Sequence, residues 1–213
     1  MKNKKIALLL LLFFVFLSIA FFVVVIPMIQ NNESKKPTLP IVGNDQNHHI
    51  QPFAFTNQDG ITITEKDVIG KIYIIEYFFA TCKGMCPKMN ENMRLVYNKF
   101  KTNDRVLILS HTVDPMRDSI KALKNYSLRF DANAKHWMFL TGDKRELYDL
   151  ARYSYLINAE QDTTGVSIDQ DFIHDKHFVL VDGKGRIRGF YDGLEVGEVN
   201  KLIGDIEILL REK

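Results

Sequence analysis

The residues best suited to chemistry are two cysteines, Cys82 and Cys86, the only two in the chain of 213 residues. Three residues separate them, and Pro87 follows directly. Such a pair could be a structural disulfide, a redox-active dithiol, a metal site or two inert core thiols. A disulfide across so short a loop restricts the unfolded chain very little. Thiols that flank a helix start are also poorly explained as core packing, so redox chemistry and metal binding are the favoured hypotheses.

Pro87 predicts the local geometry of the pair, because proline suits the first helical position, where its missing N–H has no intrahelical partner. A helix expected over 87–101 then places Cys86 near the N-cap. The positive end of the helix dipole lowers the pKa of a thiol there, and the thiolate is the form that attacks disulfides and binds metals. Gly84 allows the preceding loop to fold back, so the two sulfurs can share a bond or a metal ion.

The elements that must position the thiols are strands alternating with helices. Apolar runs rich in β-branched and aromatic residues predict buried strands at 71–79, 106–110 and 137–142. Helices are expected at 87–101, 118–130, 144–155 and 196–212, the second with Asp118 as its N-cap. Two short strands around Asp59-Gly60 open the domain, and a hairpin of 177–182 with 187–191 follows later. This order predicts an α/β fold, a mixed sheet flanked by helices in the thioredoxin-like arrangement.

Two histidines stand where thioredoxin-type oxidoreductases carry a proline that faces their cysteines. No proline follows Pro115, and the stretch D-F-I-H-D-K-H supplies His174 and His177. The antiparallel strand from His177 should start beside the end of the strand 71–79, so a histidine there can face the thiols. His174 is the favoured ligand and His177 the less favoured one. Two thiolates and an imidazole suit Cu(I), or Cu(II) with an added ligand, and zinc would accept the same set with a fourth donor.

The other residues with soft or nitrogen donors are expected to have structural roles. We expect His111 and His136 to be structural, His48 and His49 to be solvated residues of a tether, and Met85, Met89 and Trp137 to pack in the core.

The N-terminal segment predicts a membrane anchor. From Ile6 to Gln30 no residue is charged, which is long enough for a transmembrane helix. A cleaved signal peptide is the alternative, since Ser18-Ile19-Ala20 resembles a cleavage site, but the apolar run continues beyond the usual length of such a signal. We therefore expect an anchor at 1–29, a polar linker at 30–50 and a folded domain at 51–213.

Basic residues predict the orientation of this anchor. Lys2, Lys4 and Lys5 precede the uncharged run, whereas Lys35 and Lys36 follow it. The positive-inside rule then puts the short N-terminus in the cytoplasm and the folded domain outside it. The net charge is only +2 and the charges are interspersed, which makes a nucleic-acid partner unlikely.

The domain resembles the SCO/SenC family of copper-binding, thioredoxin-like proteins. The matching segments are T-C-K-G-M-C-P at 81–87, V-D-P-M-R-D at 113–118 and W-M-F-L-T-G at 137–142. The family's histidine stands at a fixed distance before the acidic residue of the closing hairpin, and counting back from Asp182 selects His174. Lys83 departs from the proline that many members have after the first cysteine, and His177 is not part of the family pattern.

The resemblance implies a function and a ligand set. It implies one copper bound by Cys82, Cys86 and His174, with Asp114 supporting the site. It implies assistance in assembling the binuclear copper centre of cytochrome c oxidase subunit II, with another copper chaperone as donor. The expected location is the bacterial inner (cytoplasmic) membrane, single-pass, with the soluble domain on the periplasmic side.

Two alternatives stay open as classes of enzyme. A membrane-anchored thiol–disulfide oxidoreductase would use Cys82 and Cys86 as its redox-active pair on the oxidase subunit or another exported protein. The missing proline and the histidine argue against it. A peroxiredoxin-like peroxidase would use Thr81 with an activating arginine that the sequence does not identify.

Overall fold

The computed structural model describes residues 2–27, 38–43, 48–157, 167–168, 171–173 and 175–212. It divides into two compact units, Met1–Thr38 and Leu39–Lys213. His174, the proposed third ligand, lies outside the described residues.

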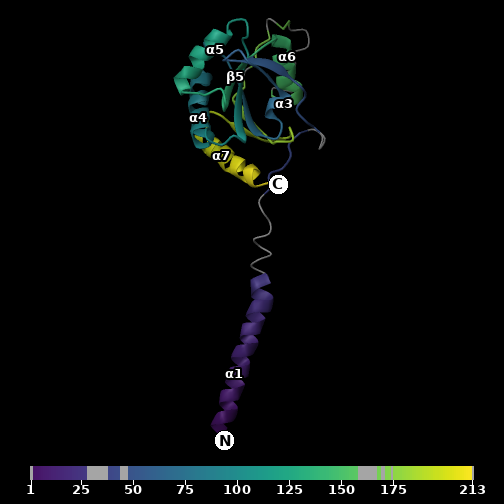
Figure 1. Ribbon diagram of the computed structural model, residues 1–213, viewed down its shortest axis with the longest axis vertical. Coiled ribbons are helices and arrows are strands. Elements are labelled where there is room, and N and C mark those ends of the chain that lie inside the picture. The colour runs from purple at the N-terminus through teal and green to yellow at the C-terminus, as the bar shows by residue number, and fades with distance from the viewer. Residues whose placement is uncertain are drawn as a thin grey trace. The chain divides into compact units, whose positions relative to one another are not determined.

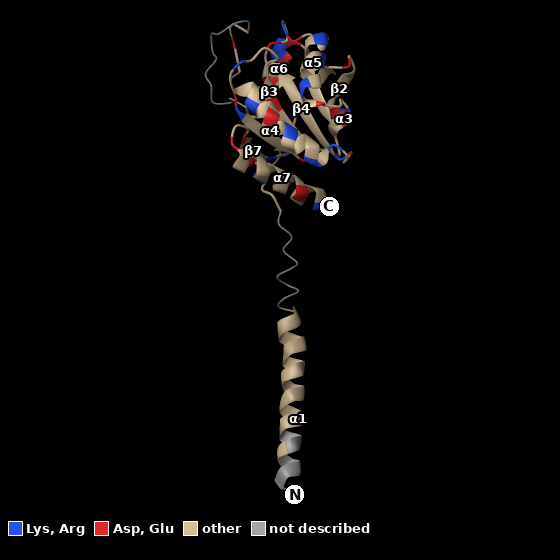
Figure 2. Cartoon of the chain, turned by 90° about the vertical axis from the view of Figure 1, so that its left-hand side faces the viewer, with Lys and Arg blue, Asp and Glu red and all other residues tan. Residues whose placement is uncertain are grey.

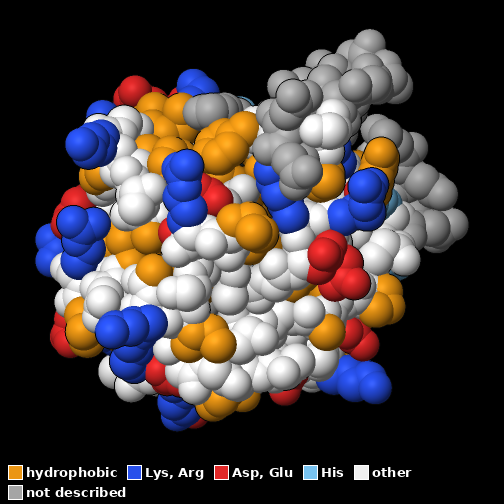
Figure 3. Space-filling view, turned by 90° about the horizontal axis from the view of Figure 1, so that it is seen from above, with side chains coloured by type: hydrophobic (Ala, Val, Ile, Leu, Met, Phe, Trp, Pro, Cys, Tyr) orange, Lys and Arg blue, Asp and Glu red, His pale blue; other side chains and the backbone are white. Residues whose placement is uncertain are grey.

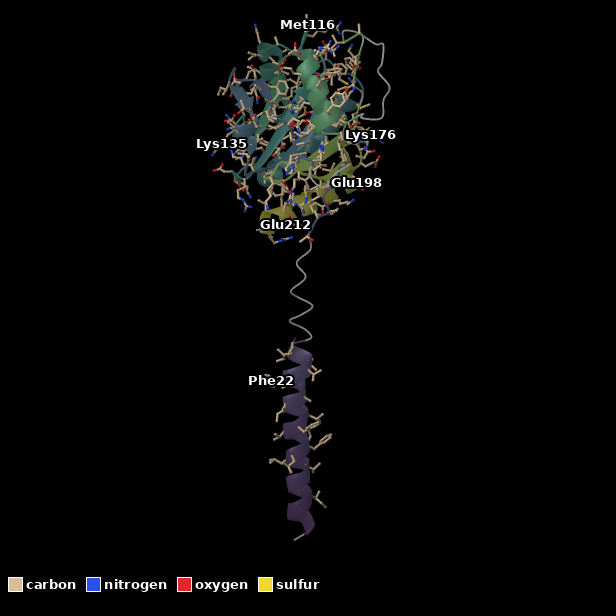
Figure 4. The ribbon with its side chains drawn as sticks, turned by 90° about the vertical axis from the view of Figure 1, so that its right-hand side faces the viewer. Phe22, Met116, Lys135, Lys176, Glu198 and Glu212 are labelled. Carbon is tan, nitrogen blue, oxygen red and sulfur yellow. The ribbon has the colours of Figure 1, made fainter. Side chains whose placement is uncertain are left out.

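The first unit consists of the helix α1 (Lys2–Ala20) followed by the π-helix η1 (Phe21–Val25). The large apolar side chains at 10–17 and 21–25 are exposed, and Phe22, which is 65% exposed, points away from the helix in Figure 4. Among the described residues, none of the helices has both the length and the apolar character that crossing a membrane requires.

The second unit is built on a sheet, which in the described residues has seven strands in the order β2-β1-β5-β4-β3-β6-β7. Strands β3 (Ile72–Phe78), β4 (Val106–Thr112) and β5 (Trp137–Thr141) are mutually parallel. The remaining strands pair antiparallel: β1 (Ala54–Asn57), β2 (Thr62–Thr64), β6 (His177–Val181) and β7 (Ile187–Asp192). The predicted mixed sheet is thus confirmed.

Helices cover both faces of this sheet (Figure 1). One face carries α4 (Met85–Phe100), α5 (Ile120–Ser127) and α7 (Val196–Arg211), and the other carries α3 (Glu65–Val68) and α6 (Lys144–Asp149). Alternate residues of β3 serve the two faces, since Ile72 and Ile74 pack in one core cluster and Tyr73 and Ile75 in the other. Both faces of β3 and β4 are buried throughout, which explains their uninterrupted apolar runs.

The predicted helices differ from the structure mainly at their ends. The helix expected over 118–130 is α5 followed by the 3-10 turn η2 (Leu128–Phe130), and Asp118 as its N-cap was wrong. Ser119 is the N-cap, because its side chain accepts a hydrogen bond from the Ala122 N–H. The helix expected over 144–155 is α6 continued by the π-helix η3 (Leu150–Ser154). The short helix α3 was not predicted.

The polar segment expected to be a tether contacts the folded unit at both of its described stretches. The Val42 N–H donates to the Ile187 carbonyl at 2.8 Å, and the Ile50 N–H donates to the Gly185 carbonyl at 2.8 Å. His48 Nε2 lies 2.7 Å from the Ser154 carbonyl, so this residue is not a solvated part of a tether. The compact unit begins at Leu39, ahead of the expected start at residue 51.

Arg188 of β7 holds the two ends of the folded unit together. It is 5% exposed and its guanidinium bonds Glu212 at 2.9 and 3.0 Å and Asp182 at 2.9 Å. The same group donates to the carbonyl oxygens of Leu39 and Pro40. Glu212 lies at the end of the domain opposite Met116 (Figure 4). Elsewhere on the unit, acidic and basic side chains are interspersed (Figure 2).

Arg188→Met should lower the free energy of unfolding by about 3 kcal/mol, because removing one partner of a buried ion pair leaves the other charge desolvated and uncompensated. Urea denaturation of the variant and the unaltered chain measures this difference. A loss below about 0.5 kcal/mol, as for an exposed surface pair, would contradict it.

Candidate functional site

The two cysteines lie where the chain leaves β3 and enters α4. The Cys82 N–H donates to the Phe79 carbonyl at 3.2 Å, which turns the loop back on itself. The Val113 N–H donates to the Phe78 carbonyl at 2.8 Å and joins this loop to the segment that follows β4. Since β3 and β4 are parallel, both loops leave the same edge of the sheet. Met116, which follows Val113 in the second loop, marks this edge at the top of Figure 4.

The thiols form a pair of unequal exposure. Both are free, Cys82 is half-buried, and Cys86 is 4% exposed and packs in the core cluster beneath α4. Their side chains lie within hydrogen-bond reach of each other. The Cys82 sulfur packs against Gly84, because a Cβ atom added to this glycine would lie 4.0 Å from it. The loop therefore does bring the two sulfurs together, as the sequence predicted.

The expected position and acidity of Cys86 need correction. Gly84 is the N-cap of α4, so Cys86 and Pro87 lie within its first turn. The pKa of the Cys86 thiol is raised to about 12, chiefly by burial and also by the neighbouring Cys82 thiol and the Glu76 carboxylate, while a backbone hydrogen bond with Phe79 acts the other way. The predicted lowering by the helix end fails for the reduced dithiol, because desolvation exceeds the effect of one helix terminus.

Asp118 supports the cysteine loop, a role that the sequence analysis missed. This residue is 1% exposed, and its Oδ2 accepts hydrogen bonds from the Ala80 N–H at 3.0 Å and the Thr112 hydroxyl at 2.5 Å. It thereby ties the loop before Cys82 to the end of β4. The available signal was the second acidic residue of V-D-P-M-R-D, which local reasoning assigned to capping a helix.

The dithiol opens into a cavity of about 230 Å³. Its walls include both cysteines, Val113, Ile173 and Asp175, with the half-buried Met85 beside them. The antiparallel pairing of β6 with β3 accounts for this, because it brings the residues before β6 to the end of β3. Ile173 and Asp175 stand on either side of His174 in the sequence, so the structure places the immediate neighbours of the predicted ligand beside the thiols.

Of the other residues linked to the site, neither His177 nor Asp114 is among the residues that line this cavity. His177 Nδ1 lies 3.1 Å from Asp175 Oδ1, and the His177 N–H donates to the same oxygen at 2.6 Å. Asp114 forms an ion pair with Arg117, with 3.6 Å between Oδ2 and Nη1. Within the residues described, His174 being outside them, no cluster of three or more His, Cys, Asp or Glu side chains is arranged to hold a metal ion.

Glu76 is a buried carboxyl group close to the dithiol and was also missed. It is 0% exposed, and its register partner Ser110 donates to Oε1 at 2.5 Å. Trp137 Nε1–H in turn donates to the Ser110 hydroxyl at 2.8 Å. Oε2 has no hydrogen-bond partner among the described residues. Burial raises the pKa of Glu76 to about 7, although the Ser110 hydrogen bond opposes the shift.

The remaining candidates have the structural positions that the sequence predicted. His111 is fully buried, stacks on Tyr77 with ring centroids 5.1 Å apart, and is kept neutral because burial lowers its pKa to about 3. His136 is 7% exposed at the start of β5, with Nε2 3.6 Å from Asp104. Met89 and Trp137 are fully buried in the core.

The surface at the site's end of the domain is mixed. Figure 3, which looks down on that end, shows apolar side chains in patches among basic and acidic ones. Met116 is 88% exposed there. A larger cavity of about 640 Å³ lies elsewhere, between β1 and η3, and its described lining contains no cysteine or histidine. The dithiol cavity is therefore the better candidate for chemistry.

A mixed sheet with two thiols at the start of the helix after its central strand defines a thioredoxin-like domain. The match to a family model is more specific. The chain belongs to the SCO1/SenC family, whose model matches residues 42–211.

Individual relatives align with most of the length of the chain. The SCO1 protein homolog of Bacillus subtilis is 29% identical over 163 residues, which cover 76% of this chain and 82% of that protein. BsSco, a member of the Sco family of cytochrome c oxidase assembly proteins with an identified disulfide switch, is structurally similar, with a TM-score of 0.66 and 26% identity over 82% of this chain and 100% of its own. Copper-bound ScoI of Bradyrhizobium japonicum gives a TM-score of 0.59 and 28% identity over 75% and 98%.

The raised pKa of Glu76 predicts a pH-dependent stability. Its folded pKa of about 7 exceeds the ordinary value of 4.5, so the folded state holds a proton that the unfolded state has lost between these values. This carboxyl therefore stabilises the fold at low pH, and the contribution is lost as the pH rises through 7. The loss amounts to at most about 3.5 kcal/mol, at about 1.4 kcal/mol for each pKa unit.

Glu76→Gln should remove this pH dependence, because an amide does not ionise. Urea unfolding of both proteins at pH 5 and pH 8, in the reduced and metal-free state, measures it. We expect the unaltered chain to lose more stability than the variant between the two pH values. Equal losses would show that Glu76 ionises without cost in the folded protein.

Proposed function

We propose that this chain is a membrane-tethered copper metallochaperone that holds one copper ion through Cys82, Cys86 and His174. The observation that carries the proposal is the shared cavity: two free thiols within hydrogen-bond reach, with Ile173 and Asp175 in the same walls. The similarity to BsSco, a Sco-family cytochrome c oxidase assembly protein, and to copper-bound ScoI of Bradyrhizobium japonicum supports it.

The donor set fits copper as cargo. Two thiolates and one imidazole form a soft ligand set of low coordination number, which suits Cu(I) and accommodates Cu(II) with a further ligand. The loop between the cysteines contains Gly84 and lies at the surface, with Cys82 half-exposed to an approaching partner. Copper displaces the thiol protons when it binds. Protons therefore compete with copper, and the copper affinity is lower at low pH. Copper would then move to an acceptor through intermediates in which donor and acceptor thiolates share the ion.

The proposed acceptor is subunit II of cytochrome c oxidase, with another copper chaperone as the donor. Oxidation would gate the transfer. Forming a Cys82–Cys86 disulfide gives two electrons and two protons to an acceptor, such as a disulfide of the partner, and removes both thiolate ligands. Reducing a partner's cysteines by this route is the alternative function, that of a thiol–disulfide oxidoreductase.

The proposed tether is the N-terminal segment. The sequence from Ile6 to Gln30 has no charge, and the apolar side chains at 10–17 of α1 are exposed. Three lysines before this run and two after it favour a cytoplasmic N-terminus. We place the protein in the bacterial inner membrane, single-pass, with the folded domain on the extracytoplasmic side.

Copper binding tests the ligand set. The purified, reduced full-length chain should bind one copper ion per chain by metal analysis, and His174→Ala, Cys82→Ser and Cys86→Ser should each weaken binding at least tenfold, because each removes one of only three ligands. His177→Ala is the matched control and should retain copper, since Asp175 is its partner in the structure. Oxidation to the disulfide should abolish binding in the unaltered chain.

Two outcomes would count against this function. Copper uptake no greater than that of an unrelated protein would exclude the metallochaperone. Rapid turnover of a disulfide substrate that His174→Ala leaves unchanged would favour the oxidoreductase instead, because electron exchange needs the two cysteines alone.

A reporter enzyme that is active only outside the cytoplasm tests the topology. Fused after residue 213, it should be active, and the protein should remain in the membrane fraction after a high-salt wash. A silent reporter would place the domain in the cytoplasm and overturn the proposed orientation.

A further inference from the structure

A buried ion pair holds Asp171, two residues before Ile173, which lines the dithiol cavity. Arg152 of η3 is 8% exposed and Asp171 is 7% exposed. The guanidinium forms two parallel hydrogen bonds to the carboxylate, Nη1 to Oδ2 at 2.6 Å and Nη2 to Oδ1 at 2.8 Å. This bidentate geometry restrains both the distance and the orientation of Asp171 relative to η3.

A second group holds the backbone of the same segment. The Tyr148 hydroxyl lies 2.9 Å from the Val113 carbonyl oxygen and 3.2 Å from that of Asp171, and accepts a 3.4 Å hydrogen bond from the Ile173 N–H. Lys144 Nζ donates to the Asp171 carbonyl at 2.9 Å. One hydroxyl thus links the segment 171–173 to the loop after β4.

These contacts end at the cavity itself. Val113 and Ile173, which the Tyr148 hydroxyl connects, both line it, together with Cys82 and Cys86. On the far side of position 174, Asp175 also lines the cavity and its carboxylate accepts the His177 N–H. The chain is therefore held to the fold directly before position 174, and residues on both sides of that position border the dithiol cavity.

The placement of Arg152 depends on an irregular helix. The Tyr155 N–H donates to the Leu150 carbonyl five residues earlier, at 2.9 Å, which is the π-helical pattern. Directly after this turn, Leu156 has a φ of 58°, a left-handed conformation that is costly for a leucine. A buried ion pair is a weak source of net stability, so this geometry is better explained by fixing one position than by strengthening the fold.

We propose that Arg152, acting through Asp171, and Tyr148 are positioning residues that fix the segment carrying the third copper ligand against the dithiol. The proposal rests on the ligand set proposed above. Neither residue touches the metal, so each sets the affinity by restricting where the imidazole can lie. Supporting groups of this kind change metal affinity by about 10–100-fold in other proteins.

The test compares Tyr148→Phe and Arg152→Met with a matched control in the full-length chain. Tyr148→Phe removes one oxygen atom and leaves the ring in the core. Arg188→Met is the control for Arg152→Met, because Arg188 is also a buried arginine held by carboxylates but lies at the other end of the domain. The measurements are Cu(I) affinity by chelator competition, the thiolate-to-Cu(II) absorption spectrum, and the reduction potential of the Cys82–Cys86 pair.

Both site variants should weaken copper binding by about tenfold or more and shift the spectrum toward that of His174→Ala. Their dithiol reduction potential should stay at the unaltered value, because the disulfide needs only the two cysteines. Arg188→Met should lose stability while keeping affinity and spectrum. If Arg152→Met does not fold, Tyr148→Phe alone decides the result.

The failures are distinguishable. If His174→Ala loses copper but Tyr148→Phe and Arg152→Met bind it as the unaltered chain does, the positioning role is wrong and the ligand set stands. If His174→Ala itself binds copper normally, the ligand set is wrong and the positioning role falls with it. An equal loss of affinity in Arg188→Met would attribute the effect to general destabilisation and overturn the inference.

Discussion

β6 runs antiparallel to β3 with Ile75 opposite Val179 and Tyr73 opposite Val181, and this register decides what faces the cysteines. Phe178 and Leu180 fill one core cluster, while Val179 and Val181 fill the other. A slip of one residue would force larger side chains into the space that the valines occupy, which a packed core resists. The apolar packing of the sheet thus fixes, at a distance, which residues the chain delivers to the dithiol cavity.

The site also depends on polar groups that are buried in the core, where they lose their contacts with water. Asp118 satisfies the Ala80 N–H, and Ser110 and Trp137 form a chain of hydrogen bonds that ends on Glu76. Burying such groups is unfavourable unless they are paired. Asp118 bonds the loop that leads to Cys82 and Glu76 lies close to Cys86, so these paired buried groups border the site.

Much of the fold followed from the sequence because its signals are local. The runs 72–79 and 106–110 have no charged residue except Glu76, and that pattern is typical of strands buried on both faces. The helix ends were less predictable, since Asp118 and Ser119 are both good N-caps. Asp118 does not cap the helix because its carboxylate accepts a hydrogen bond from the Ala80 N–H, which is close in space but distant in sequence. Ser119 caps the helix instead.

The pairing of the two thiols was predictable from the sequence, and the residues that support them were not. Cys82 and Cys86 are recognisable by residue type and spacing, and the topology brings Ile173 and Asp175, the neighbours of His174, beside them. Glu76 could have been noticed, because a carboxylate in a buried strand requires a partner. Arg152 and Asp171 could not, since their pairing depends on a π-helical turn and a long connection that no local pattern encodes.

The unequal burial of the two thiols gives the pair an order. Cys82 is half-buried and Cys86 is 4% exposed, so one sulfur is outer and the other inner. A molecule that arrives from solvent reaches the outer sulfur first, whereas the inner one lies in the first turn of α4 and packs against the core. The two sulfurs are therefore not equivalent, and an exchange with a partner from solvent begins at Cys82 rather than at Cys86.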